Sequence, residues 1–362
     1  MVETWMFTAG QSIPVAWQAC VESFPPERTD VYFHPAYCAT WLEWEKGTAV
    51  ALYAKLDNVD FLYCFLLKEV PQVLDGHWRY DAQSFYGYGG IITSAEPTDA
   101  QRVQFEDAVD MWMQERGVIA EFVRAHPLIH RWPLHARRAT FVQVRTNVYA
   151  QLPHALLQLE VGATRRNVAK ARRSGIRVER WSAAKGTTVF AHLYAQTAAR
   201  LGMDGFYHFP ERYFSGCAQW LGERAWYLVA LANGVPIAAL MILEWNRALI
   251  YHLGASDARY WDLRPNDLLF ATLLEYAEQH GYTLVSFGGG TTNNPEDTLY
   301  RYKSKFGTNH VPVFIGKRVH NRTVYDQLCS QWEQRNRDRA DRYRGYFLRY
   351  RIGEFDLCRV EE

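Results

Sequence analysis

The chain has 362 residues and a formal net charge of +1, which is enough length for two domains that each bury a core. Six scattered cysteines form no C-x-x-C pair, which excludes the common metal and redox motifs. The longest apolar stretch, 225–243, is interrupted at Asn233, Gly234 and Pro236, so it indicates a β-hairpin rather than a membrane span. The N-terminus lacks the basic and apolar regions of a signal peptide, and we expect a cytoplasmic protein.

The first part of the chain contains a pattern of hairpin, strand, helix and strand. Residues 49–56 and 61–70 are apolar runs on either side of a turn at Asp57, and they predict a hairpin. A glycine-rich extended stretch follows at 84–93. An amphipathic pattern predicts a helix over 98–115, and a strand is expected at 118–124.

The middle of the chain connects this pattern to a second one. A strand is expected at 140–149, and helices are expected at 185–201 and 211–221. Residues 164–175 are strongly basic and predict a short helix, with Thr164 as its N-cap. Glycine at the end of this segment is typical of a helix C-terminus.

The second pattern repeats the order of the first. A hairpin is expected over 226–231 and 236–244, an extended strand over 249–256, a helix over 265–280 and a strand over 282–287. Two copies of one element order predict two related α/β domains, and ligands tend to bind where such domains meet. From His320 onward the sequence predicts a long polar helix of mixed charge, which is not expected to bind nucleic acid.

The predicted fold class is α/β (α+β), with two tandem domains that each hold a mixed, mostly antiparallel sheet flanked by helices. We place the first domain at residues 1–150, the second at 151–320 and a C-terminal helix at 321–362.

Several strings support this division and resemble one known family. In chain order they are SFYGYGG (84–90), GVIAEFVRAHP (117–127), RRNVAKARRSG (165–175), YHLGAS (251–256), RPN (264–266), FGGG (287–290) and LYRYKSKFG (299–307). Together they resemble the FemABX-like transferases, whose members carry two GNAT-type (BioF2-like acetyltransferase) domains. The resemblance covers roughly residues 30–320. The sustained heptads of a coiled-coil arm, which the staphylococcal-type members carry, are missing from this sequence.

The resemblance implies an acyltransferase that forms an amide by moving an aminoacyl or acyl group onto an amine of a cell-envelope precursor. One alternative is an acyl-CoA-dependent GNAT N-acyltransferase that acts on an amino sugar or small amine. Another is a non-catalytic protein that binds a nucleotide or lipid precursor. In the first two cases the amine attacks the activated acyl group directly, so the site must supply orientation, a proton acceptor and a donor to the oxyanion.

The implied reaction places the donor and the chemistry in the second domain and the acceptor in the first. Lys303 of the second domain is the candidate catalytic residue. It lies in the string Y-K-x-x-F-G at 302–307, which is similar to the family's F-K-x-x-F-G pattern. A cation there would stabilise an oxyanion or a leaving oxygen. Spacing alone favours a surface lysine, and the motif is what points to function. Lys305 in the same turn is the second candidate, assigned to the donor. Three candidates for the general base remain open: Asp257, Glu244 and His252.

The substrate-binding candidates come from the basic helix and from aromatic positions of both copies. A basic helix face suits phosphate capture, although such faces are often only solvated. The full set is Arg165, Arg166, Asn167, Lys170, Arg200, Tyr213, Tyr251, Tyr86 and Tyr88.

The donor-binding candidates surround the predicted helix start at Pro265. In a GNAT fold this N-terminus receives the donor's phosphates on free backbone N–H groups, and Asp267 is expected to cap the helix. The set is Ser256, Arg264, Pro265, Asn266 and Lys305. We expect no metal and no tightly bound cofactor. The donor is aminoacyl-tRNA or acyl-CoA, the acceptor an envelope precursor or amino sugar, with peripheral membrane contact left open and DNA not expected.

Overall fold

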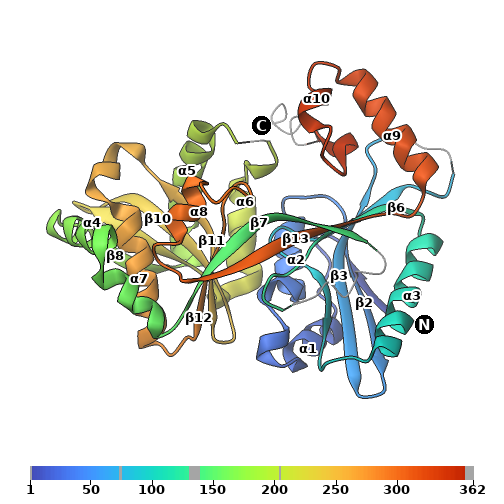
Figure 1. Cartoon of the computed structure of the whole chain (residues 1–362), viewed down its shortest axis with the longest axis horizontal. Helices are drawn as coiled ribbons and strands as arrows, with labels where there is room; N and C mark the ends of the chain where they lie inside the picture. The colour runs from blue at the N-terminus through green and yellow to red at the C-terminus, as the bar shows by residue number, and fades with distance from the viewer. Residues whose placement is uncertain (1, 73–75, 130–138, 204, 355–362) are drawn as a thin grey trace. The chain divides into compact units, whose positions relative to one another are not determined.

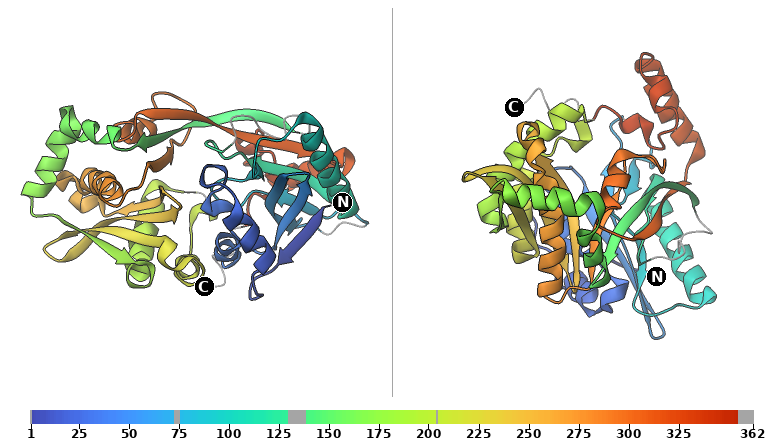
Figure 2. Two further views of the ribbon diagram at one scale, coloured as in Figure 1. Left: turned by 90° about the horizontal axis from the view of Figure 1, so that it is seen from below. Right: turned by 60° about the vertical axis from the view of Figure 1, so that its left-hand side comes forward.

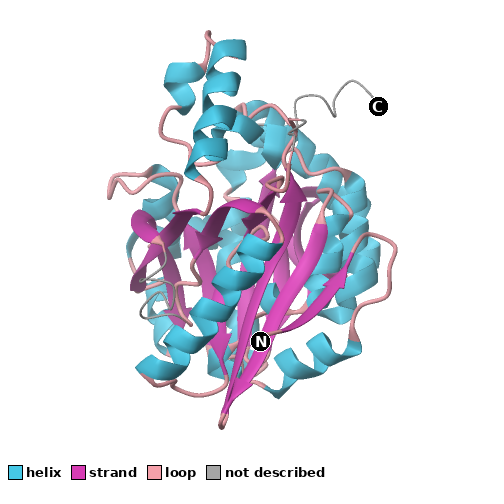
Figure 3. Cartoon of the chain, turned by 90° about the vertical axis from the view of Figure 1, so that its right-hand side faces the viewer, coloured by secondary structure: helices cyan, strands magenta, loops and turns pink. Residues whose placement is uncertain are grey.

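The computed structural model describes residues 2–72, 76–129, 139–203 and 205–354. These residues form two compact units, 1–142 with 314–362, and 143–313. The chain passes between the units within two strands, β7 (Thr140–Gln151) and β13 (Asn309–Val319) (Figure 1). Both units are built from strands and helices, which Figure 3 colours magenta and cyan, so the predicted α/β class is confirmed.

The first unit is built on a hairpin. Its strands run in the order β1-β2-β3-β4-β6-β13, and β5 pairs with β3. They are β1 (Glu3–Phe7), β2 (Thr48–Leu56), β3 (Val59–Glu69), β4 (Tyr80–Gln83), β5 (Gly90–Thr93), β6 (Val118–Arg124) and the end of β13. The helices of this unit are α1 (Val15–Ser23), α2 (Pro35–Leu42), α3 (Asp99–Glu115), α9 (Arg322–Arg335) and α10 (Ala340–Tyr343).

The hairpin and helix α3 form as the sequence predicts. Asp57 adopts φ 54° in the turn between β2 and β3, and Thr98 caps α3 with a capping box to Gln101. The stretch 84–93 is not continuously extended, because β4 ends at Gln83 and β5 begins at Gly90. Gly87 between them has φ +99°, and a Cβ there would lie 2.2 Å from the Tyr32 ring, so a tight turn replaces the expected strand.

The C-terminal segment also differs from the sequence prediction. The expected single long helix is α9 followed by a break, the short α10 and a 3-10 turn at Arg349–Arg351, drawn red in both views of Figure 2. One face of α9 is apolar and packs on β6, with Leu328 and Trp332 buried. The fully buried Asp81 carboxylate holds this segment, because it accepts from Arg351 at 2.7 Å and from Tyr350 at 2.8 Å.

The second unit has the strand order β7-β12-β11-β10-β9-β8, in which only β11 and β12 are parallel. The strands are β7, β8 (Arg177–Ser182), β9 (Ala225–Ala232), β10 (Val235–Trp245), β11 (Ala248–Ser256) and β12 (Leu284–Gly289). The helices are α4 (Gly162–Arg173), α5 (Ala183–Leu201), α6 (Glu211–Gly216), α7 (Pro265–Gln279) and α8 (Thr298–Lys303).

Helices α7 and α5 cover opposite faces of this sheet. Trp226 of β9 packs against Tyr276 of α7, with ring centroids 5.1 Å apart. The next residue, Tyr227, packs against Phe190 of α5 at 4.9 Å. Since successive side chains of a strand point to opposite faces, the two helices bury both sides of β9. The sheet is therefore a central layer, and its exposed ends carry the loops that build a site.

Candidate active site

The parallel pair β11 and β12 separates after three residue pairs. Residues 248–250 are paired with 284–286, and the strands then no longer pair with each other. Beyond this point β12 shifts register against β7 between Ser286 and Gly288. The separation leaves the end of β11, the triple-glycine segment 288–290 and helix α8 facing one region, which is where the candidate catalytic residue lies.

Lys303 is a buried lysine, not a surface one. Only 6% of the residue is exposed, and its Nζ donates to Gly289 O at 2.7 Å. The ammonium nitrogen also lies 5.2 Å from the centre of the Tyr251 ring on β11. Burial, and secondly the positive charge of Arg145, lower the pKa of Lys303 to about 7, although Asp297 opposes the shift. The amine is therefore present in both protonation states near neutral pH.

A single carboxylate shapes the loop that holds Lys303. Asp297 is the N-cap of α8, and its Oδ1 accepts from the N–H groups of Leu299 and Tyr300 at 3.0 and 2.9 Å. Its Oδ2 accepts from the N–H groups of Thr291 and Thr292 at 2.9 and 3.0 Å and also from both hydroxyls. Burial raises the pKa of Asp297, but these hydrogen bonds outweigh it and hold the pKa well below its usual range.

The start of α7 has uncapped backbone N–H groups. Its N-cap is Arg264, at φ +62°, which makes no side-chain capping bond, and Pro265 follows at the first helical position. Asn266 donates to Ser256 Oγ at 3.4 Å. Asp267 is not a cap, contrary to expectation: it is buried and accepts from Asn167 of α4 at 3.0 Å. The N-terminus is thus left open for a ligand anion.

Helix α4 lies along α7 in the same direction where the two touch. Asn167 meets Asp267, and five residues later Arg172 pairs with Glu275 at 2.7 Å. The two N-terminal ends therefore lie on the same side. Helix α4 begins at Gly162 with Val161 as an N-cap that makes no side-chain bond. Thr164 is buried inside the helix, so the expected cap at Thr164 is wrong.

Three of the predicted basic and polar residues of α4 point outward. Arg165, Arg166 and Lys170 are exposed, and no ion pair joins them to other residues in the described part of the chain. This helix has no acidic residue, so its positive charge is not neutralised locally. Both helix N-termini and this charge favour an anion at the same end of the unit.

Tyr302 adds a buried polar atom to the site. Its hydroxyl is buried, and no residue in the described ranges hydrogen-bonds to it. Burial and the nearby Asp267 carboxylate raise the pKa of Tyr302 well above its ordinary value. The ring packs edge-on against Phe270 of α7 with centroids 5.4 Å apart. Lys305, two residues after Lys303, is exposed, and its Nζ lies 5.2 Å from the centre of this ring.

Two predicted substrate-binding residues are tied into the structure around β11. Arg200 at the end of α5 donates to Ser256 O at 3.2 Å and stacks on Trp261 at 4.4 Å. Tyr213 is fully buried, and its hydroxyl lies 2.7 Å from His252 Nε2. Burial lowers the pKa of His252 to about 3, so this imidazole is neutral at pH 7 and accepts a proton poorly.

The other candidate bases are engaged elsewhere. Asp257 forms a two-pronged ion pair with Arg259, which holds the pKa of Asp257 below its usual value. Glu244 acts on the phenol of Tyr282 and, after burial, helps to raise the pKa of Tyr282. Among the groups weighed, Lys303 is the one with a pKa near neutrality in the region where β11 and β12 separate.

The predicted aromatic residues of the first unit belong to a ring cluster. Tyr86 stacks on Trp41 with centroids 5.5 Å apart and an interplanar angle of 10°. Tyr88 meets the ring of Tyr32 edge-on at 5.4 Å and that of His126 at 5.3 Å. Both tyrosines are half-buried. The cluster belongs to the first unit, whereas Lys303 belongs to the second.

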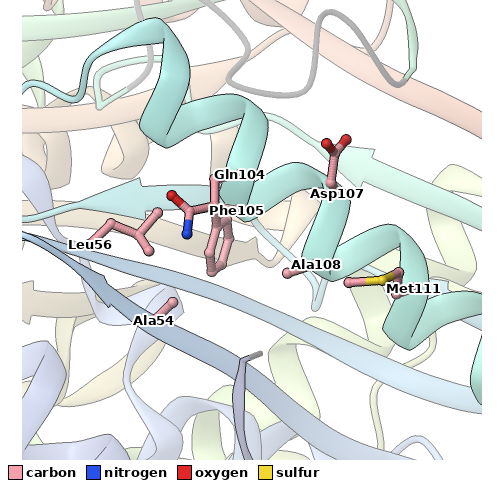
Figure 4. Close-up of a pocket in the computed structure, with 7 residues that line it drawn as sticks. All are labelled: Ala54, Leu56, Gln104, Phe105, Asp107, Ala108 and Met111. Carbon is pink, nitrogen blue, oxygen red and sulfur yellow. The ribbon is translucent and has the colours of Figure 1, made fainter.

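A hollow in the first unit is a further feature that the sequence does not predict. It lies between β2 and α3 and is lined by Leu56, Gln104, Phe105 and Met111, among others (Figure 4). Its walls are mainly apolar, and Gln104 and Asp107 are the polar residues that line it. In the described residues no group of three or more His, Cys, Asp or Glu could hold a metal ion, and no described helix is long and apolar enough to cross a bilayer.

Sequence reasoning missed Arg145 and Asp297. Asp297 directly precedes the first residue of α8, and an Asp at this place is a sequence signal for a helix N-cap that could have identified it. Arg145 gives no local signal, because only the pairing of β7 with β12 brings it to the triple-glycine segment.

Comparison with known proteins finds a matched domain that contains these features. Residues 162–304 match the model of the acetyltransferase (GNAT) domain, which includes α4, β11, α7 and Lys303. The chain is 30% identical over 110 residues to the lipid II:glycine glycyltransferase of Staphylococcus aureus strain USA300, covering 28% of this chain and 25% of that protein. The Staphylococcus saprophyticus protein of the same name is 30% identical over 81 residues, 21% and 19% of the two chains. The matches thus span a quarter or less of these relatives.

Solved structures extend the likeness to most of the chain. The crystal structure of FemX matches with a TM-score of 0.66 at 15% identity, over 86% of this chain and 97% of that one. The structure of L-PGS from Bacillus licheniformis matches with a TM-score of 0.56 at 12% identity, over 84% and 91%. At these identities the likeness shows the fold, which extends beyond the matched GNAT domain to both units. The comparisons thus show a GNAT domain at residues 162–304 and the fold of FemX over most of the chain.

Proposed function

We propose that the chain is an acyltransferase that moves an aminoacyl or acyl group onto an amine of a cell-envelope precursor. The observation that carries this proposal is the buried Lys303, held against Gly289 where β11 and β12 separate, inside the matched GNAT domain. Relatives named lipid II:glycine glycyltransferase support an envelope precursor as acceptor. An amino sugar is the alternative acceptor.

The geometry suits direct attack by the acceptor amine. The reaction needs positive charge or a hydrogen-bond donor beside the oxygen that becomes negative. Lys303 has one N–H bonded to Gly289 O, so its other N–H bonds, or its lone pair when the amine is neutral, can face a substrate. Tyr251, whose pKa burial raises to about 12, stays protonated and forms one wall of this region. No protein nucleophile is required.

The donor's phosphates would bind at the shared end of α4 and α7. Arg264, Asn266 and the uncapped N–H groups of α7 lie there, and Arg166 and Lys170 add exposed positive charge on α4. Acyl-CoA and aminoacyl-tRNA both carry phosphates, so the same groups suit either donor. Both donors are cytoplasmic compounds, and the proposed reaction takes place in the cytoplasm, with the enzyme able to work at the membrane surface on a lipid-linked acceptor. The predicted contacts of Arg165, Asn167, Arg200, Tyr213, Tyr86 and Tyr88 with substrate remain predictions.

The experiment that tests the function separates the donors. Acetyl-CoA, longer acyl-CoAs and charged tRNA are offered one at a time, and both thermal stabilisation and amide formation on an amine acceptor are measured. A donor that binds the folded protein at 100 times its Kd raises the free energy of unfolding by about 2.7 kcal/mol. Stabilisation and transfer by charged tRNA alone would select aminoacyl transfer, and by acyl-CoA alone the acyl-CoA reaction. Absence of transfer with every donor would overturn the proposal.

A further inference from the structure

Arg145 reaches the triple-glycine segment from the neighbouring strand. It lies on β7, two residues before Asn147, which is paired with Gly289. Its Nη1 is 3.5 Å from Gly290 O, a long hydrogen bond. The Arg145 Nε is buried, and no described residue hydrogen-bonds to it. A Cβ on Gly289 would lie 2.8 Å from Arg145 Cδ, so the glycine leaves room for the arginine stem.

Two cationic side chains therefore contact consecutive carbonyl groups of the triple-glycine segment. Lys303 Nζ is bonded to Gly289 O, and the Arg145 guanidinium lies next to Gly290 O. Like charges in a buried place repel each other more strongly than they do in water. Asp297, the carboxylate that acts on Lys303, has both oxygens occupied by N–H and hydroxyl groups of its own loop. The positive charge at this point is only partly compensated.

We propose that Arg145 is a positioning residue that acts on acyl transfer through Lys303: its fixed charge opposes the protonated form of the Lys303 amine and leaves that amine able to accept the proton of the attacking nitrogen. This rests on the proposed function, and it names the general base that the sequence leaves open.

The proton transfer balances within the reaction. The acceptor nitrogen forms a C–N bond to the acyl carbon, the carbonyl π electrons move to oxygen, and the nitrogen becomes positively charged. Neutral Lys303 takes one proton from this nitrogen. When the carbonyl reforms, the C–O or C–S bond to the donor breaks, and the lysine ammonium returns the proton to the leaving oxygen or sulfur. The lysine ends as it began, and the products are an amide and an alcohol or thiol.

The groups around Lys303 agree with this assignment. Arg145 faces it from β7, Asp297 from the loop before α8 and the Tyr251 ring from β11. Tyr302 precedes it on its own helix, and the Asp267 carboxylate of α7 acts on the Tyr302 hydroxyl. Burial and then Arg145 lower the pKa of Lys303 to about 7, and Asp297 acts in the opposite direction. Arg145 is thus the cation on another element that acts on this amine.

The test measures the titration of Lys303 itself, which needs no substrate. The full chain is labelled with lysine carrying ¹³C at Cε, and its NMR signal is followed from pH 5 to pH 11, with Lys303→Arg used to assign it. In Arg145→Gln we expect the Lys303 amine to bind its proton about three- to tenfold more tightly. Arg145→Lys should restore the wild-type midpoint. Arg301→Gln removes an exposed arginine of the same helix, paired with Glu296 at the surface, and should leave the midpoint in place.

Activity gives the second readout. In Arg145→Gln the limb of the pH–rate profile that reports Lys303 should move to higher pH, together with the NMR midpoint. If Arg145 only supported the fold, kcat would fall without movement of this limb. An unchanged Lys303 midpoint in Arg145→Gln, or an equal shift in Arg301→Gln, would overturn the proposal. Should the Gln variant not fold, Arg145→Met keeps the stem and carries the same test. If no donor gives transfer, the proposed function fails, while the NMR titration still decides the link between Arg145 and Lys303.

Discussion

Replacing Asp297 with alanine should remove the hydrogen bonds that hold the loop before Lys303 in place. The carboxylate caps α8 through Leu299 and Tyr300 and binds the N–H groups of Thr291 and Thr292. Loss of an N-cap costs about 1 kcal/mol, and hydrogen bonds to a charged group contribute about 1.5–3 kcal/mol each without being additive. We therefore expect Asp297→Ala to lower the free energy of unfolding by about 2–4 kcal/mol.

The matched variant is Asp297→Asn. Asparagine keeps one oxygen for the helix cap but turns an NH₂ group toward the other pair of N–H donors, so its loss should be smaller than that of alanine. The assay is urea unfolding of the full chain, followed by kcat. The variant loop no longer fixes Gly289 and Lys303, and transfer should fall with stability. An Asp297→Ala protein within about 0.5 kcal/mol of wild type, the range of an ordinary surface substitution, would refute the reasoning.

The difference in the free energy of unfolding between wild type and Asp297→Ala should depend on pH. The pKa of Asp297 is lower in the folded protein than in the unfolded chain. Its stabilisation is therefore fully present above the unfolded value, about 4, and is lost as the pH falls through the folded value. The difference between wild type and Asp297→Ala should be constant at neutral pH and shrink below about pH 4. A difference that grows on acidification would contradict the assigned hydrogen bonds.

Three further changes have clear expectations. Gly254→Ala would place a Cβ 2.4 Å from the Tyr251 hydroxyl, so the Tyr251 ring must shift from its place beside Lys303 and kcat should fall; an unchanged kcat would show that this ring does not contribute. Arg351→Leu leaves the carboxylate of Asp81 buried without its cation, and urea unfolding should show a loss of about 3–5 kcal/mol; an unchanged midpoint would count against the C-terminal anchor. Arg166→Gln should weaken donor binding and reduce the slope of log Kd against log salt by up to about one, whereas identical slopes would remove Arg166 from the phosphate site.

Local sequence signals predict much of the fold. The apolar runs of β2, β3, β9 and β10 predict their hairpins, because turn residues such as Asp57 and Asn233 separate them and adopt positive φ. Thr98 and Pro265 mark the starts of α3 and α7, since a capping oxygen and a fixed φ act within one turn. These signals depend on neighbours in sequence and need no tertiary contact.

The candidate site depends on contacts that are distant in sequence. The spacing of Lys303 predicts a surface lysine. In the structure the residue is buried, because it contacts Gly289 O and the Tyr251 ring. Asp267 reads as a cap, but Asn167 of α4 draws its carboxylate away from the α7 N-terminus. Arg145 has no local signal at all, because strand pairing alone brings it to the loop. The resemblance to a family located Lys303, and the structure supplies its environment.

The proposed activity depends most directly on Lys303. The decisive measurement is kcat for amide formation by Lys303→Met, with the donor that stabilises the wild-type protein. Lys46→Met, which removes an exposed lysine of the first unit, serves as the control. Removal of one group that stabilises an oxyanion or transfers a proton lowers kcat by about 10²–10⁴-fold, so we predict a loss in that range for Lys303→Met and wild-type kcat for Lys46→Met. A folded Lys303→Met protein with wild-type kcat would contradict the account.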